Sequence, residues 1–200
     1  MPHRGNSGDF SVMKIILASG SPRRKSLLES IGLDFTVYSP NVNEEHLPGE
    51  LPSQLCRRLS GLKAGAGARE FPDAVIIAAD TIVVIDGQIL GKPSGHEDAV
   101  RMLHLLSGRE HEVITGLAVS YGGNVKIADV HTTVKFRKLS EREISAYADT
   151  AEPYDKAGGY AVQGTGALMI EGINGDYYNV VGLPLCTLGR LLADTGVNLL

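Results

Sequence analysis

Three cations follow a serine-rich turn near the start of the chain. The segment 19–25 reads SGSPRRK and comes directly after the short apolar run 14–18. Ser21 and Pro22 are typical of the cap and the first position of a helix, which places the cations in its first turn. A helix N-terminus is electropositive, so cations are unfavourable there unless an anion binds to its free N–H groups. We therefore favour an anion site over side chains that bend into solvent, although the Walker A and GxGxxG patterns are both absent from the sequence.

A carboxylate interrupts the most apolar segment of the chain. Asp80 lies within 74–85, AVIIAADTIVVI, whose continuous apolar character is typical of a strand covered on both faces. An unpaired buried carboxylate costs several kcal/mol, so Asp80 would need a metal ion, a cation or an activated water. The alternative is an aspartate that ends the strand and caps a turn. The apolar residues that follow Asp80 weaken this alternative, and we predict a functional role.

A glycine-rich loop is the third candidate. The segment 152–164, EPYDKAGGYAVQG, would allow close backbone approach to a ligand, although a flexible surface loop has a similar composition. Lys63, Lys92 and the pair at 44–45 are weaker signals, since they also fit a snorkelling lysine, a turn residue and a solvated acidic pair. The histidines show no metal-ligand spacing, and no nucleophile triad is supported. The residues alone predict a phosphate-handling α/β protein.

Alternating strands and helices must position these candidates. Apolar runs and period-two alternation predict strands at 14–18, 35–39, 74–85 and 88–90, and a hairpin with arms at 112–121 and 125–137. Helical spacing and caps predict helices at about 22–31, 52–69, 95–107, 140–148 and 183–193. Two capping boxes, Ser94 with Glu97 and Ser140 with Glu143, mark helix starts. We expect one mixed α/β domain over 13–200.

Composition limits the classes of partner. The chain has 200 residues, with 19 Lys and Arg against 23 Asp and Glu, a net charge of −4 that argues against nucleic-acid or membrane binding. Two distant cysteines indicate neither a disulfide framework nor a zinc site. No apolar run approaches the ~20 residues of a membrane span, and residues 1–12 lack the apolar core of a signal peptide. We therefore expect a cytoplasmic protein whose first 12 residues are a disordered extension or tag, and the sequence leaves a homodimer open.

Ordered motifs along the whole chain from residue 13 resemble the Maf family of nucleoside triphosphate pyrophosphatases. They are IILASGSPRRKSLL (15–28), NEE (43–45), LKA (62–64), AADTIV (78–83), GKP (91–93), VITG (113–116), EPYDKAGGYAVQG (152–164) and YNVVGLPL (178–185). Gly159 and Ala161 stand where the family more often has Ala and Gly. Gly61 and Gly67 lie in a helix that usually has fewer glycines. Residues 1–12 have no counterpart.

The resemblance implies a mixed, twisted sheet with flanking helices, like that of inosine triphosphate pyrophosphatases, with two lobes around a cleft. It also implies hydrolysis of a nucleoside triphosphate to the monophosphate and pyrophosphate, with Mg²⁺ or Mn²⁺. Asp80 would be the proton acceptor, and Arg23, Thr81 and Gln163 would govern substrate choice. A triphosphate needs cations and donors around it, and the phosphate-binding set that we expect is Ser19, Ser21, Arg24, Lys63, Lys92 and Lys156. The hard oxygen ligands Glu45 and Asp80 would suit Mg²⁺ or Mn²⁺ better than zinc.

The segment 155–164 further resembles the subgroup that acts on dTTP and UTP. The Gln163 amide offers a donor and an acceptor, which match the carbonyl and N–H edge shared by thymine and uracil. The alternative is that Gln163 only holds the loop. Other readings are the subgroup specific for 7-methyl-GTP, a non-catalytic nucleotide-binding regulator of septum formation and cell division, and another phosphate-transfer enzyme such as a kinase. The missing P-loop disfavours the last.

Overall fold

The computed structural model describes residues 13–197 and 199, so the expectation for residues 1–12 lies outside the described residues. Seven strands form one mixed sheet in the order β2-β1-β3-β5-β6-β7, with β4 paired to β3. The strands are β1 (Ile15–Ala18), β2 (Thr36–Tyr38), β3 (Val75–Ile85), β4 (Gln88–Leu90), β5 (Glu110–Tyr121), β6 (Asn124–Phe136) and β7 (Ile170–Asn174). β1 is parallel to β2 and β3, and the other pairs are antiparallel. The predicted mixed α/β fold is confirmed.

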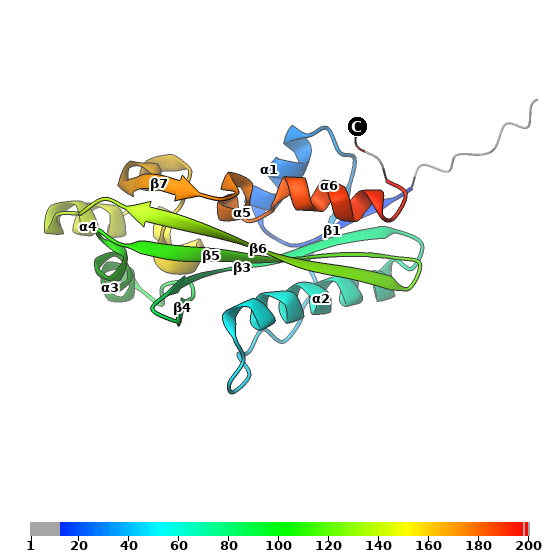
Figure 1. Cartoon of the computed structure of the whole chain (residues 1–200), viewed down its shortest axis with the longest axis horizontal. Helices are drawn as coiled ribbons and strands as arrows, with labels where there is room; N and C mark the ends of the chain where they lie inside the picture. The colour runs from blue at the N-terminus through cyan, green and yellow to red at the C-terminus, as the bar shows by residue number, and fades with distance from the viewer. Residues whose placement is uncertain (1–12, 198, 200) are drawn as a thin grey trace, which may run out of the picture.

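Six α-helices and three 3-10 turns surround this sheet in the described part of the chain. The helices are α1 (Pro22–Ser30), α2 (Pro52–Glu70), α3 (His96–Leu106), α4 (Glu141–Ala148), α5 (Tyr177–Val181) and α6 (Leu185–Ala193). The turns are η1 (Glu152–Asp155), η2 (Ala157–Gly159) and η3 (Gly164–Met169). In Figure 1, α2 lies along one face of the long strands, whereas α1 and α6 cover the other face. α3, α4 and β7 gather at the opposite end of the molecule.

β3 is buried on both faces, as its apolar sequence predicted. Ile76 packs in a cluster with Ala64 of α2, whereas Ile77 packs with Leu28 of α1 and Leu188 of α6. A separate hydrophobic cluster fills the end of the molecule that carries α3 and α4. Its fully buried members include Leu103, Phe136 and Ile144. The long strands thus contact hydrophobic clusters on both faces near α1, α2 and α6, and a further cluster near α3 and α4. We call these two ends of the molecule its lobes (Figure 1).

Glycines bring α2 close to the sheet. A Cβ at Gly116 of β5 would lie 2.2 Å from the backbone oxygen of Cys56, and one at Gly67 would lie 2.7 Å from Ile76 Cγ2. A glycine in a helix, such as Gly67, lowers stability by up to about 1 kcal/mol relative to alanine. Here the missing side chain allows the helix to lie close to the sheet. Gly116 is also paired in register with Asp80 on β3, so α2 crosses the sheet beside the candidate carboxylate.

The structure confirms one of the predicted helix caps and contradicts another. The capping box of Ser140 and Glu143 is confirmed, since each residue's side chain accepts from the other's backbone N–H. The box at Ser94 and Glu97 is wrong, because α3 begins at His96 after Gly95 and both Ser94 donors bind Asp98 instead. Ser21 does occupy the cap position of α1, but its side chain makes no capping hydrogen bond.

The segment 152–182 carries regular structure that its sequence pattern does not predict. It forms the three 3-10 turns, then β7 and α5. Within the described residues, no helix combines the length and the hydropathy needed to cross a membrane.

Candidate active site

A cavity of about 720 Å³ opens between the two lobes. It is lined by the β1–α1 junction, the middle of β3, one face of α2, the loop 155–163 and the end of α5. The cavity gathers ten of the predicted site residues, namely Ser19, Ser21, Arg23, Arg24, Lys63, Asp80, Thr81, Lys92, Lys156 and Gln163. Glu45 does not line it, but its neighbour Glu44 does.

A buried ion pair occupies the floor of the cavity. Lys63 Nζ lies 2.6 Å from Asp80 Oδ1 and 2.8 Å from Glu44 Oε1. Lys63 and Asp80 are only 9% and 8% exposed, so each charge depends on the other for compensation. Among the described residues, Asp80 Oδ2 has no hydrogen-bond partner. The cation that the buried aspartate required is therefore Lys63, and one carboxylate oxygen is left for a ligand.

Arg24 is held by three segments that are far apart in the sequence. Its guanidinium donates to Ser19 Oγ at 3.0 Å, to Thr81 Oγ1 at 3.0 Å and to the Gly182 carbonyl at 2.8 Å. Burial lowers the pKa of Arg24, and the charge of Asp80 opposes this shift. An arginine remains protonated in proteins, so Arg24 is a fixed cation.

The Thr81 hydroxyl belongs to a buried chain of hydrogen bonds. It lies 2.8 Å from Thr115 Oγ1, which is also 3.2 Å from the backbone oxygen of Asn179. Thr81 therefore links β3 and β5 to α5 and holds Arg24 in place. We call Ser19, Arg24, Lys63, Asp80 and Thr81 the sheet wall of the cavity.

Two of the three cations in the first turn of α1 turn toward the cavity. Arg23 and Arg24 line it, whereas the exposed Lys25 forms an i,i+4 pair with Glu29 at 3.6 Å. The unfavourable placement of cations at a helix N-terminus is thus partly relieved by an acidic partner, because Arg23 reaches Asp155.

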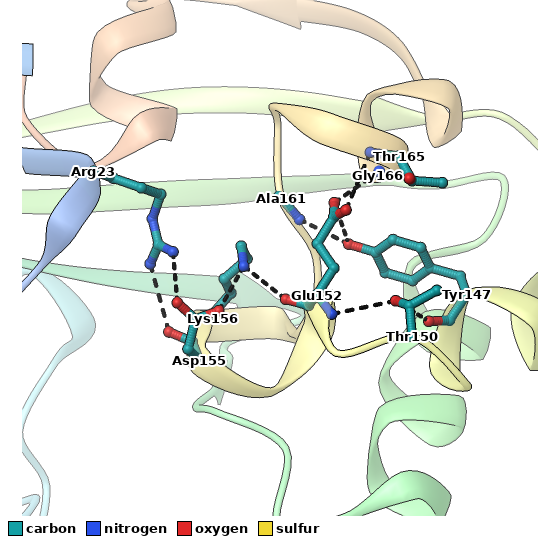
Figure 2. Close-up of polar contacts among 9 residues, drawn as sticks. All are labelled: Arg23, Tyr147, Thr150, Glu152, Asp155, Lys156, Ala161, Thr165 and Gly166. Carbon is teal, nitrogen blue, oxygen red and sulfur yellow. Dashed lines mark hydrogen bonds and ion pairs between the residues drawn. The ribbon is translucent and has the colours of Figure 1, made fainter. Parts of the chain in front are cut away.

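The opposite side of the cavity is built by Lys92 and residues 155–163, which we call the loop wall. Asp155 bridges two cations, with Arg23 Nη1 at 2.9 Å and Lys156 Nζ at 2.5 Å (Figure 2). Although burial opposes it, hydrogen bonding from Lys156 and Arg23 lowers the pKa of Asp155. Lys92 and Gln163 are exposed, and within the described residues neither side chain has a hydrogen-bond partner. The loop wall thus offers polar groups that are free to meet a ligand.

Three lining residues with polar side chains were not singled out from the sequence. Glu44 was interpreted as part of a solvated pair, and Asp155 was read only as part of a loop. Tyr160 lines the cavity as well, and its hydroxyl lies 2.7 Å from Nε2 of the buried His111. Burial lowers the pKa of His111 to about 4, so its ring is neutral near pH 7. The alternation of β5 could have indicated a buried histidine, but nothing local pointed to Tyr160.

Glu45 is turned away from the cavity by its own local turn. Its backbone N–H donates to Asn43 Oδ1 at 2.9 Å, and its carboxylate accepts from Asn43 Nδ2 at 3.2 Å. Its carbonyl accepts from Arg58 at 2.8 Å. These contacts leave Glu44, and not Glu45, beside Lys63.

The mixed sheet and the cation-lined cavity define an α/β protein whose site suits a polyphosphate. The family model described as Maf-like protein matches residues 14–195, and the chain belongs to the Maf family. It is 49% identical to the "dTTP/UTP pyrophosphatase" of Dictyoglomus thermophilum over 94% of this chain and 98% of that one. The protein of the same name from Symbiobacterium thermophilum is 45% identical over 92% and 95%. The resemblance stated from the motifs is thereby confirmed.

Among solved structures, the chain is similar to the Ham1 protein of Staphylococcus aureus. The TM-score is 0.48 and the sequence identity 17%, over 78% of this chain and 79% of that one.

Proposed function

We propose that this protein hydrolyses dTTP and UTP to the nucleoside monophosphate and pyrophosphate. The observation that carries the proposal is a buried carboxylate with one free oxygen, Asp80, in a cavity lined by Arg24, Lys63, Lys92 and Lys156. Cations are required there because a triphosphate carries three to four negative charges. The names of relatives that are 45% to 49% identical over nearly the whole chain support the same reaction.

Asp80 would act as the general base. Its Oδ2 would accept a proton as the water oxygen bonds to the α-phosphorus, and the α–β anhydride bond would break with its bridging oxygen leaving in pyrophosphate. Lys63 supports this role because it binds only Oδ1 and fixes the carboxylate. Arg24 cannot move far, given its three partners, and such fixed charges stabilise a developing anion with little reorganisation.

The donor set of the cavity fits a divalent ion that binds together with the nucleotide. Asp80 and Glu44 both bring carboxylates to Lys63, and Glu45 follows directly in the chain. No cluster of three or more ligating side chains occurs in residues 13–197, which agrees with Mg²⁺, commonly bound by one or two carboxylates and by substrate phosphates. When bound, Mg²⁺ or Mn²⁺ would polarise the phosphate that is attacked.

Titration calorimetry tests the metal site. We expect Mn²⁺ alone to bind weakly and nucleotide to strengthen its binding. The Glu44→Gln variant should reduce this gain in Mn²⁺ affinity.

Base choice would depend on Gln163. Its amide is exposed at the cavity and has no hydrogen-bond partner within residues 13–197, so its donor and acceptor are available to the carbonyl and N–H edge of thymine or uracil. Cytosine presents an amino group in place of O4, so the amide orientation that pairs with thymine or uracil would leave its own donor unsatisfied. Arg23 and Thr81 would contribute by placing charge and by holding Arg24.

A pyrophosphate-release screen tests the proposal. The substrates are dTTP, UTP, CTP, GTP and 7-methyl-GTP, each with Mg²⁺, Mn²⁺ or a chelator. We expect metal-dependent turnover with dTTP and UTP ahead of the others, and Gln163→Ala should lose the discrimination against CTP while the exposed Gln88→Ala keeps it. Preference for either guanine nucleotide would refute the substrate assignment. Nucleotide binding without any turnover would favour the non-catalytic regulator.

A further inference from the structure

Gln163 stands at a helix cap but does not act as one. It is the N-cap residue of the 3-10 turn η3, and its side chain makes no capping hydrogen bond. A cap residue ordinarily satisfies the free N–H groups of the first turn with its own side chain. Gln163 instead presents its amide at the cavity, so another group must meet those N–H donors.

That group is the carboxylate of Glu152, which comes from η1 and lies outside the cavity lining. Glu152 Oε2 accepts from the Thr165 N–H at 3.1 Å, and Oε1 accepts from the Gly166 N–H at 2.9 Å (Figure 2). These are the second and third positions after the Gln163 cap. A Cβ at Gly164 would lie only 2.9 Å from Glu152 Oε2, so the glycine there leaves room for the carboxylate.

Tyr147 holds the other side of the loop. Its hydroxyl donates to Glu152 Oε1 at 3.0 Å and accepts from the Ala161 N–H at 3.1 Å (Figure 2). Tyr147 is 4% exposed, and burial raises the pKa of its phenol, so the hydroxyl keeps the proton that it donates. Glu152 and Tyr147 therefore bind the backbone on both sides of Gln163, at Ala161 before it and at Thr165 and Gly166 after it.

We propose that Glu152, with Tyr147, is a positioning residue for base selection: it caps η3 in place of Gln163 and so frees the Gln163 amide to read the base. This inference rests on the proposed function. Glu152 also connects base reading to phosphate binding, because its carbonyl accepts from Lys156 Nζ at 2.7 Å. Neither Glu152 nor Tyr147 lines the cavity, so a nucleotide bound there would contact neither side chain.

The test compares kcat/KM for dTTP and CTP on the same preparation of each variant. The ratio is independent of the fraction of folded enzyme, so it separates positioning from stability. We expect Glu152→Ala to lower the preference for dTTP roughly tenfold or more, toward that of Gln163→Ala. Glu152→Gln keeps one acceptor oxygen and should lose less, and Tyr147→Phe should also fall between. In the Glu152→Ala and Gln163→Ala double variant, the preference for dTTP should drop no further than in Gln163→Ala. The reason is that both changes remove the same interaction, the pairing of the Gln163 amide with the base.

Asp98→Asn is the matched control. Asp98 also binds the backbone at a helix start with its carboxylate, since its Oδ2 accepts from the Ser94 N–H at 3.0 Å just before α3, and it does not line the cavity. It should lower the thermal midpoint and leave the dTTP:CTP ratio unchanged. Equal loss for both nucleotides in the Glu152 variants, or additive effects in the double variant, would overturn the inference while the proposed function stands. Wild-type protein that cleaves no nucleotide would overturn the proposed function itself, and this inference with it.

Discussion

The two walls of the cavity hold their polar groups in opposite ways. On the sheet wall, Asp80 and Lys63 are at least nine-tenths buried and paired with each other, and Arg24 has three protein partners. On the loop wall, the Asp155 side chain is 55% exposed and the Gln163 amide has no partner among the described residues. The same ligand would therefore meet fixed charges on one side, and on the other it would meet exposed groups of which Lys92 and Gln163 are unengaged among the described residues.

This difference matches two separate tasks. Groups that stabilise charge in a reaction are most effective when they are fixed beforehand, which strands β1 and β3 and helix α2 provide. Groups that select a substrate act through the hydrogen bonds they offer, and a loop can change these without disturbing a core. We therefore expect changes on the sheet wall to reduce turnover of every nucleotide and changes on the loop wall to alter affinity or preference.

The largest effect is expected from Asp80→Asn. It preserves shape and polarity but removes the proton acceptor, so kcat should fall roughly 10²- to 10⁴-fold for every nucleotide while binding persists. Asp86→Asn is the control, because Asp86 lies just beyond the far end of the same strand, exposed and paired with Arg109. Single-turnover pyrophosphate release measures both. Near-normal turnover in Asp80→Asn would show that Asp80 is not the general base.

The support that β5 gives to the loop wall should depend on pH. His111 of β5 supports Tyr160 of the loop wall, and its pKa of about 4 is lowered by burial from an unfolded value near 6.5. The unfolded chain then binds more protons between these values, so stability is full above pH 6.5 and falls by about 3 kcal/mol toward pH 4. Urea unfolding at pH 7 and pH 4 should show this loss. The His111→Gln variant should lose less unfolding free energy between pH 7 and pH 4 than the wild-type protein. An equal loss in both proteins would contradict the prediction.

Removing one cation from each wall should give different signatures. Arg24→Ala and Lys92→Ala each remove a charge-assisted bond to phosphate worth roughly 1.5–3 kcal/mol, which weakens triphosphate binding roughly 10- to 150-fold. Only Arg24→Ala should also lower the thermal midpoint, since it leaves Ser19, Thr81 and Gly182 without their donor. Lys25→Ala, on the outer side of the same helix, is the control. Unchanged triphosphate affinity, measured against monophosphate, would mean that neither residue binds the phosphates.

The smallest effect is expected from Asp155→Asn. The exposed ion pairs of Asp155 with Arg23 and Lys156 are worth at most about 1 kcal/mol, and they compete with the phosphates for the same cations. Neutralising Asp155 should therefore tighten triphosphate binding by up to about fivefold at low salt, and less at high salt. Weaker binding would mean that Asp155 holds the cations in place for the ligand.

Much of the fold and most of the candidate site could be predicted because the relevant signals are local. Continuous apolar runs predicted β3, and alternation predicted the β5–β6 hairpin. The capping box at Ser140 marked the start of α4. The turns, strand and short helix of 152–182 were missed because glycine-rich sequence lacks a hydrophobic period, and their conformation depends on distant groups such as Tyr147.

By itself, the sequence determined the strand that carries Asp80, the cations that follow β1 and the glycine-rich loop with Gln163. An aspartate in an apolar run shows that a partner is needed, but only the tertiary structure decided that the partner is Lys63. It also decided that Glu44 and not Glu45 joins that pair, and that Glu152 caps η3 in place of Gln163. The physical reason is that periodicity and capping act over a few residues. Side-chain pairing depends instead on which segments pack together, as α2 does on β5 at Gly116.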